Sequence, residues 1–146
     1  MATDAQILEG LELFSELGQK ELEQIALIAE STLVGEGEVL TRRGDVAETL
    51  YIVLSGNFMV YFKEGQAFTL HKQGELMGVF TVQTPFRYIS TAVALTDGKV
   101  LTLPSRELLR LIEGNAAIGD KMMRKINAIA AEKPHLNVEE TVQDDN

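Results

Sequence analysis

Side chains that could perform catalysis are few and scattered in this sequence. The chain has two histidines, His71 and His135, and no cysteine, so thiolate chemistry, disulfides and cysteine-ligated metals are excluded. A β-rich metalloenzyme would need two or three histidines and a carboxylate around one ion, but His135 stands among acidic residues near the end of the sequence. His71, alone beside a predicted turn, is expected to be a surface residue. We therefore predict no metal site and no cofactor.

The sequence also lacks the patterns of serine and phosphoryl chemistry. No serine stands in a Gly-x-Ser-x-Gly pattern, and no glycine-rich loop ends in the lysine that phosphoryl transfer uses. Ser55 is expected in a turn, and Ser105 is expected to cap a helix. We therefore predict that the protein is not an enzyme and acts by binding.

Length and charge limit the class of protein further. A chain of 146 residues, 45% of them hydrophobic, suits one domain with one core. The formal charge of −9 repels phosphate backbones, so no direct binding of nucleic acid is expected. No run approaches the ~20 apolar residues of a membrane helix. Residues 1–10 carry no export signal, so we expect a cytoplasmic protein that does not bind membranes.

Acidic residues gather at the end of the sequence. Residues 132–146 contain one basic residue, Lys133, and five acidic residues: Glu132, Glu139, Glu140, Asp144 and Asp145. We predict a folded domain at residues 1–133 and an acidic, disordered tail at residues 134–146. A tail that docks on a basic partner is the alternative.

The elements that must position any site follow from the hydrophobic pattern. Short β-branched and aromatic runs at 50–54, 58–62, 67–70, 88–95 and 100–103 are separated by turn sequences, which predicts the strands of a roll or sandwich. Helical spacing is found at 21–30, after Gly18 as N-cap, and again at 105–113 and 116–131. The predicted fold class is α+β, mostly β: a double-stranded β-helix, or jelly-roll-like β-roll, flanked by an N-terminal helix and two C-terminal helices.

One apolar stripe in the last predicted helix needs a partner surface. It consists of Ile118, Met122, Ile126 and Ile129. Such a stripe can pack on the domain's own roll, or it can form the seam of a homodimer. The sequence leaves both alternatives open.

Several motifs at the right distances resemble those of the cyclic-nucleotide-binding domain shared by catabolite-activator-type regulators, kinase regulatory subunits and gated channels. The resemblance covers about residues 13–132. The most specific motif is residues 50–56, Leu-Tyr-Ile-Val-Leu-Ser-Gly, and it is joined by Gly37-Glu38-Val39-Leu40, Gly44-Asp45, Gly74, Gly78 and Leu103-Pro104. The resemblance implies a regulatory domain built on a β-roll.

In that family, the segment around the cyclic phosphate usually has a Phe-Gly-Glu triplet, a short helical turn, and an arginine six residues before an alanine. The glutamate binds the ribose hydroxyl, while the arginine and backbone N–H groups hold the phosphate. Here the triplet reads Met77-Gly78-Val79, and counting back six residues from Ala94 gives Tyr88, so both polar anchors are missing. The predicted ligand site comprises Gly78, Val79, Phe80, Thr81, Arg87, Tyr88, Ile89 and Ser90.

Two nearby residues offer a different reading of this site. Arg87 lies one residue from the anchor position, and a bulge or loop there could turn its side chain inward. Glu75 would supply the missing glutamate if Gly74-Glu75-Leu76 were the triplet. We predict a regulatory ligand-sensing or interaction domain without the usual nucleotide anchors. The alternatives are a genuine cAMP or cGMP receptor that uses Arg87 and backbone amides, and a dimerisation module without a ligand.

Overall fold

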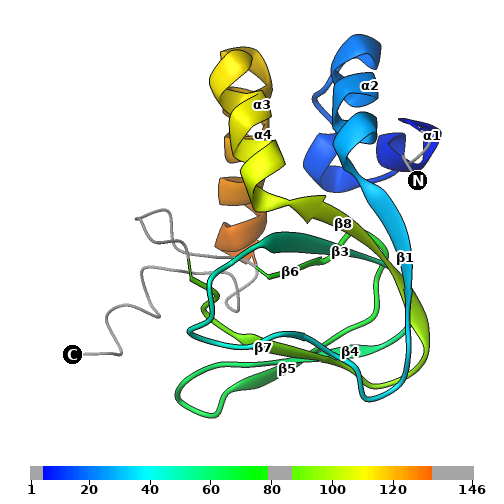
Figure 1. Cartoon of the computed structure of the whole chain (residues 1–146), viewed down its shortest axis with the longest axis vertical. Helices are drawn as coiled ribbons and strands as arrows, with labels where there is room; N and C mark the ends of the chain where they lie inside the picture. Colours follow the sequence, from blue (N-terminus) through cyan, green and yellow to red (C-terminus); the bar gives the residue numbers. More distant parts are fainter. Residues whose placement is uncertain (1–4, 79–86, 133–146) are drawn as a thin grey trace.

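A computed structural model of the chain describes residues 5–78 and 87–132. In this part of the chain, eight strands form two antiparallel sheets that face each other, and the helices lie beyond one of them (Figure 1). The predicted α+β, mostly β class is confirmed. The strands are β1 (Glu30–Val34), β2 (Val39–Thr41), β3 (Thr49–Ser55), β4 (Phe58–Tyr61), β5 (Ala67–Leu70), β6 (Leu76–Met77), β7 (Thr91–Ala94) and β8 (Gly98–Pro104).

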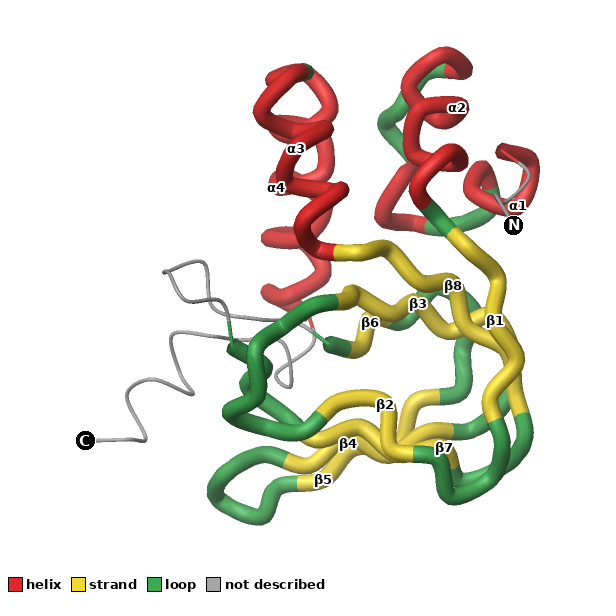
Figure 2. The backbone as a smooth tube through the Cα atoms, in the orientation of Figure 1, coloured by secondary structure: helices red, strands yellow, loops and turns green. Residues whose placement is uncertain are grey.

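The sheets are built largely from strands that are distant in the sequence. The first sheet has the order β1-β8-β3-β6, and the second has the order β2-β7-β4-β5. Glu30 of β1 lies opposite Thr102 of β8, and Phe58 of β4 lies opposite Ala94 of β7. Figure 2 shows the sheets as the upper and lower layers of the roll. The chain therefore winds back and forth between the layers, as a jelly-roll does.

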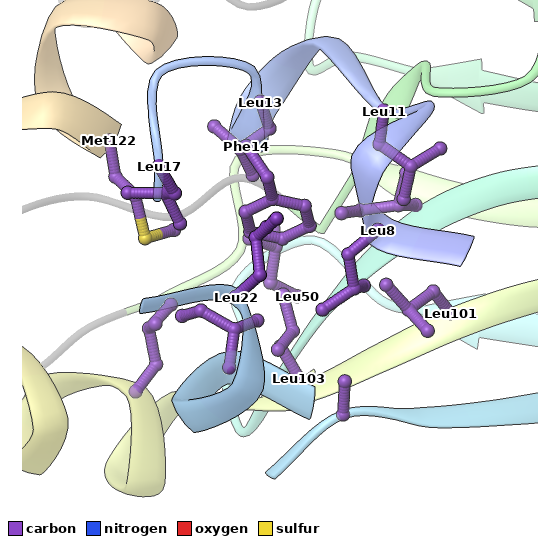
Figure 3. Packing of buried hydrophobic residues seen from close by; sticks show 14 of the residues in the cluster. Leu8, Leu11, Leu13, Phe14, Leu17, Leu22, Leu50, Leu101, Leu103 and Met122 are labelled. Atoms are coloured by element: carbon purple, nitrogen blue, oxygen red, sulfur yellow. The ribbon is translucent and has the colours of Figure 1, made fainter. Parts of the chain in front are cut away.

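Strand β3 divides the apolar interior into two cores. Successive side chains of a strand point to opposite faces, so Leu50 and Ile52 pack with the helices while Val53 packs between the two sheets. Figure 3 shows the core on the helical side, where Leu50, Leu101 and Leu103 of the sheet meet apolar side chains from the N- and C-terminal helices.

The helices are α1 (Ala5–Glu9), the 3-10 helix η1 (Glu12–Phe14), α2 (Gln19–Ile28), α3 (Ser105–Gly114) and α4 (Ala116–Glu132). Helix α2 begins after Gly18, as predicted, and the Gly18 N–H donates a 2.9 Å hydrogen bond to the Glu21 carboxylate. The chain is already extended at Ala29, so α2 ends two residues before the predicted end and β1 begins at Glu30.

The predicted role of Ser105 as a helix cap is wrong. Ser105 is the first residue of α3, and the preceding Pro104 occupies the cap position without a side-chain hydrogen bond. The Ser105 N–H donates to the Glu48 carbonyl at 2.8 Å. Its hydroxyl is buried and has no hydrogen-bond partner among the described residues.

The apolar stripe of α4 packs within the chain, which corrects the dimer alternative for these residues. Ile118, Met122 and Ile129 are buried, at most 7% exposed, in the core on the helical side, and Ile126 packs against it. Two ion pairs hold the same helix to the N-terminal region, from Lys121 to Glu21 at 2.7 Å and from Arg124 to Glu16 at 3.1 Å. Because these side chains are already buried within one chain, they are not available to contact a second copy.

Candidate ligand site of the roll

The candidate site begins at Gly78, directly after β6. Gly78 has a φ of +79°, a conformation that glycine adopts without steric cost. A Cβ atom at this position would lie 2.9 Å from the Thr49 carbonyl oxygen, 3.2 Å from the Tyr51 ring and 3.3 Å from the Tyr88 ring. Gly78 is therefore required both by its backbone conformation and by the close approach of the Thr49 carbonyl.

Tyr88, which the sequence analysis placed where an arginine is expected, binds the backbone at the start of β3 with its hydroxyl. The hydroxyl donates to the Thr49 carbonyl at 2.7 Å and accepts from the Thr49 N–H at 3.0 Å. The last β3–β6 pair is Tyr51 with Met77, so Thr49 lies two residues beyond it. The Tyr88 side chain thus makes the two hydrogen bonds that a continued β6 would have made.

The environment of Tyr88 keeps it neutral. Tyr88 is 7% exposed. Burial raises the pKa of its phenol to about 12, and the hydrogen bond with the Thr49 backbone offsets only part of this rise. Burial also raises the pKa of Tyr51. Near neutral pH, both phenols are uncharged, and neither supplies the positive charge that a cyclic phosphate would need.

Arg87 is directed to the surface loop that follows β2. The side chain is exposed, and its Nη1 donates a 3.0 Å hydrogen bond to the Gly44 carbonyl. The backbone of Arg87 forms an isolated antiparallel bridge with Val46. This pairing fixes the register, so that Tyr88 turns inward and Arg87 turns outward.

Glu75 binds the turn that precedes it. Its Oε1 accepts hydrogen bonds from the backbone N–H groups of His71, at 3.1 Å, and Lys72, at 2.8 Å. The Glu75 carbonyl accepts from the Val53 N–H at 2.8 Å, which holds this turn against β3. These contacts explain Glu75 as a turn-stabilising residue.

The other predicted site residues divide into two groups. Ile89 is 7% exposed and packs between the sheets, while Ser90 is 4% exposed and its carbonyl accepts from the Thr41 hydroxyl at 3.0 Å. Val79, Phe80 and Thr81 lie outside the described residues. Thr49 and Tyr51 were missed by the sequence analysis. The alternation along β3 was the available signal, because it places both on the same face as Val53.

In the part of the chain that the structure describes, no group of three or more histidine, aspartate or glutamate residues could hold a metal ion. The helices found there are too short or too polar to cross a bilayer.

Comparison with known proteins now places this roll in a family. The model of the cyclic nucleotide-binding domain matches residues 32–115, which is more than half of the chain. The chain belongs to this family. Its fold is also that of solved family structures. One is a putative cyclic nucleotide-binding protein from Geobacter metallireducens, with a TM-score of 0.80 and 24% identity over 90% of this chain and 98% of that one.

Other relatives show how widely the fold is used. A regulatory subunit of a cAMP-independent protein kinase A from Trypanosoma brucei has a TM-score of 0.74 and 19% identity, over 94% of this chain and 49% of that one. Uncharacterized NTE family proteins of Mycobacterium tuberculosis and Mycobacterium bovis are 26% identical over 123 residues, which is 84% of this chain. This chain spans about a fifth of the length of these curated relatives, 21%.

Proposed function

We propose that this domain is a regulatory sensor or interaction module that acts by binding and does not use cAMP or cGMP as its ligand. The observation that carries the proposal is the pair of hydrogen bonds between the Tyr88 hydroxyl and the Thr49 backbone, 2.7 and 3.0 Å long. They support the proposal because Tyr88, a neutral and buried side chain, stands at the position where the resemblance to the family predicts the phosphate-binding arginine.

The expected loss of nucleotide affinity is large. A hydrogen bond to a charged group contributes about 1.5 to 3 kcal/mol, so the absence of both the arginine and the glutamate costs roughly 3 to 6 kcal/mol. At about 1.4 kcal/mol per tenfold change, a micromolar site would be weakened roughly 10² to 10⁴-fold. The formal charge of −9 also opposes an anionic ligand, although salt screens this effect.

The contacts at Gly78 support a site filled by the protein's own side chains. The rings of Tyr51 and Tyr88 lie where a Cβ of residue 78 would touch them, so these two side chains fill the space beside Gly78. We retain Gly78, Val79, Phe80, Thr81, Tyr88, Ile89 and Ser90 as the lining of the ligand site. Of the eight predicted site residues, Arg87 is the least favoured, because its guanidinium binds the Gly44 carbonyl at the surface. That contact also weighs against the alternative of an Arg87-dependent cyclic nucleotide receptor.

The role of the domain is regulatory in this proposal. Binding of a non-nucleotide ligand or of a protein would be passed on to a partner or to an attached region, in the cytoplasm, without catalysis and without direct contact to nucleic acid. The regulatory fold supports this role.

Thermal unfolding in the presence of ligands tests the proposal. A ligand that binds only the folded state stabilises it by RT ln(1 + [L]/Kd), about 2.7 kcal/mol at 100 times Kd. We expect no shift of Tm for the wild type with micromolar cAMP or cGMP, and a shift for the variant that carries Val79→Glu and Tyr88→Arg. The same screen with haem and small aromatic acids would identify another ligand class. A wild-type shift with micromolar cAMP or cGMP would overturn the proposal.

A further inference from the structure

The outer face of the second sheet is uncharged across all four strands. One row of laterally paired residues runs Val39, Val93, Met59, Thr69, from β2 through β7 and β4 to β5. In the next row, Tyr61 pairs with Ala67 on one side and Thr91 on the other. We call these two rows, together with Leu95, which extends β7 beyond Ala94, the outer face.

The outer face carries three of the eight exposed large hydrophobic residues of the described chain. Tyr61 is 41% exposed, Leu95 38% and Val39 37%. Neither core includes any residue of the outer face, because the described helices pack on the first sheet (Figure 1). Contiguous exposed apolar surface of this kind marks an interaction site more often than scattered residues do.

Opposite charges flank the two ends of the outer face. Within three residues of the strand ends on the Leu95 side lie three acidic residues and one lysine: Glu36, Glu38, Asp97 and Lys72. Within three residues of the strand ends on the Tyr61 side lie three basic residues and one glutamate: Arg42, Arg43, Lys63 and Glu64. All eight residues are exposed. One end is therefore acidic and the other is basic.

We infer that the outer face binds the outer face of a second copy of this chain, in a two-fold symmetric dimer. A two-fold axis that lies in the plane of the interface, perpendicular to the strands, would lay the acidic end of one copy over the basic end of the other, twice. Sheets pack face to face at about 10 Å through uncharged side chains, and the two central rows supply these. The charge pattern selects a second copy as the occupant, since it is complementary to itself.

The dimer is expected to be weak. Four strands about 4.8 Å apart and about four residues of ~3.4 Å each give a flat face of roughly 250 to 300 Å². A standard interface buries about 800 Å² per partner, so the charged ends must contribute and association should be seen only at high concentration and low salt. This inference does not depend on the ligand of the roll.

Sedimentation velocity over a wide concentration range tests the dimer with matched variants. We expect the average mass of the wild type to rise towards that of a dimer at low salt. Met59→Glu, in the central row, should abolish the rise, whereas Met123→Glu should leave it unchanged. Met123 is 42% exposed on α4, away from the outer face. A wild type that stays monomeric at the highest concentration, or a Met59→Glu variant that still associates, would overturn the inference.

A charge exchange tests the two-fold arrangement itself. The variant Arg42→Glu/Arg43→Glu has two acidic ends, and Glu36→Lys/Glu38→Lys has two basic ends, so each should fail to associate alone. An equimolar mixture should associate at least as well as the wild type. Thermal unfolding verifies that both variants fold, which matters because Glu38 accepts a 3.1 Å hydrogen bond from the Gly35 N–H. If both folded variants fail to associate in the mixture, the proposed orientation is wrong.

Discussion

At the scale of single residues, the proposed function rests on Tyr88, which stands where the resemblance to the family predicts an arginine. The sequence alone showed that an arginine is missing at this position, because Tyr88 stands where one is expected. That its hydroxyl would bind both backbone groups of Thr49 could not be predicted, since this depends on β6 ending at Met77. The same limit applies to Arg87 and Glu75, whose partners are carbonyl and amide groups of surface turns.

Removing the Tyr88 hydroxyl should destabilise the fold. Tyr88→Phe leaves the N–H and carbonyl of Thr49 without their partner, and an unsatisfied buried group costs about 1 to 3 kcal/mol. Urea denaturation measures the loss. Tyr61→Phe is the matched control, because Tyr61 is 41% exposed, and its effect should stay within about 0.5 kcal/mol. Equal stability of Tyr88→Phe and the wild type would refute the proposed role of this hydroxyl.

At the scale of elements, the sequence predicted β3, β4, β5, β7, β8 and the last three helices, because turn residues bound these strands and helical spacing repeats along these helices. Strand β5 was predicted with its observed bounds, Ala67–Leu70. The elements that were missed are short: β1, β2, β6, α1 and η1 have two to five residues each. Leu8 and Phe14 in the short N-terminal helices are nevertheless at most 1% exposed. Burial of such segments is decided by tertiary contacts, which no local pattern reports.

The two neighbouring methionines of α4 test the packing of this helix. Met122 is 1% exposed in the core on the helical side, whereas Met123 is 42% exposed. Met122→Ala should lower the free energy of unfolding by about 2 to 5 kcal/mol, and Met123→Ala should change it by no more than about 0.5 kcal/mol. Denaturant unfolding compares them, and sedimentation should show no effect of Met122→Ala on self-association. Similar losses for both variants would contradict the orientation of α4 described above.

At the scale of the whole molecule, the β-roll is a scaffold with one helix-covered sheet and one open sheet. Its family could be recognised from sequence because turn glycines and strand motifs keep their spacing. The proposed homodimer surface could not be recognised from the sequence. The most conspicuous apolar stripe is that of α4, and its pattern is the same whether the helix packs within a chain or between chains. Only the assembled fold separates the buried stripe from the exposed outer face.

Alkaline pH should weaken the whole fold through Tyr88. An unfolded tyrosine loses its proton near pH 10, but burial raises the pKa of Tyr88 to about 12 in the folded protein. Between these values the folded state binds more protons than the unfolded state, so the free energy of unfolding falls as the pH rises. Urea denaturation from about pH 9 to 12 should show a shallower fall for Tyr88→Phe than for the wild type. Parallel curves would contradict the burial of this phenol.

Titration calorimetry of the wild-type chain with cAMP and with cGMP tests the central claim most directly. With a neutral, hydrogen-bonded Tyr88 at the arginine position and Val79 at the glutamate position, we expect no binding at low micromolar concentrations and a Kd of roughly 100 µM or weaker. A low-micromolar Kd for either nucleotide would contradict the account, and its loss in Arg87→Ala would then identify Arg87 as the phosphate anchor.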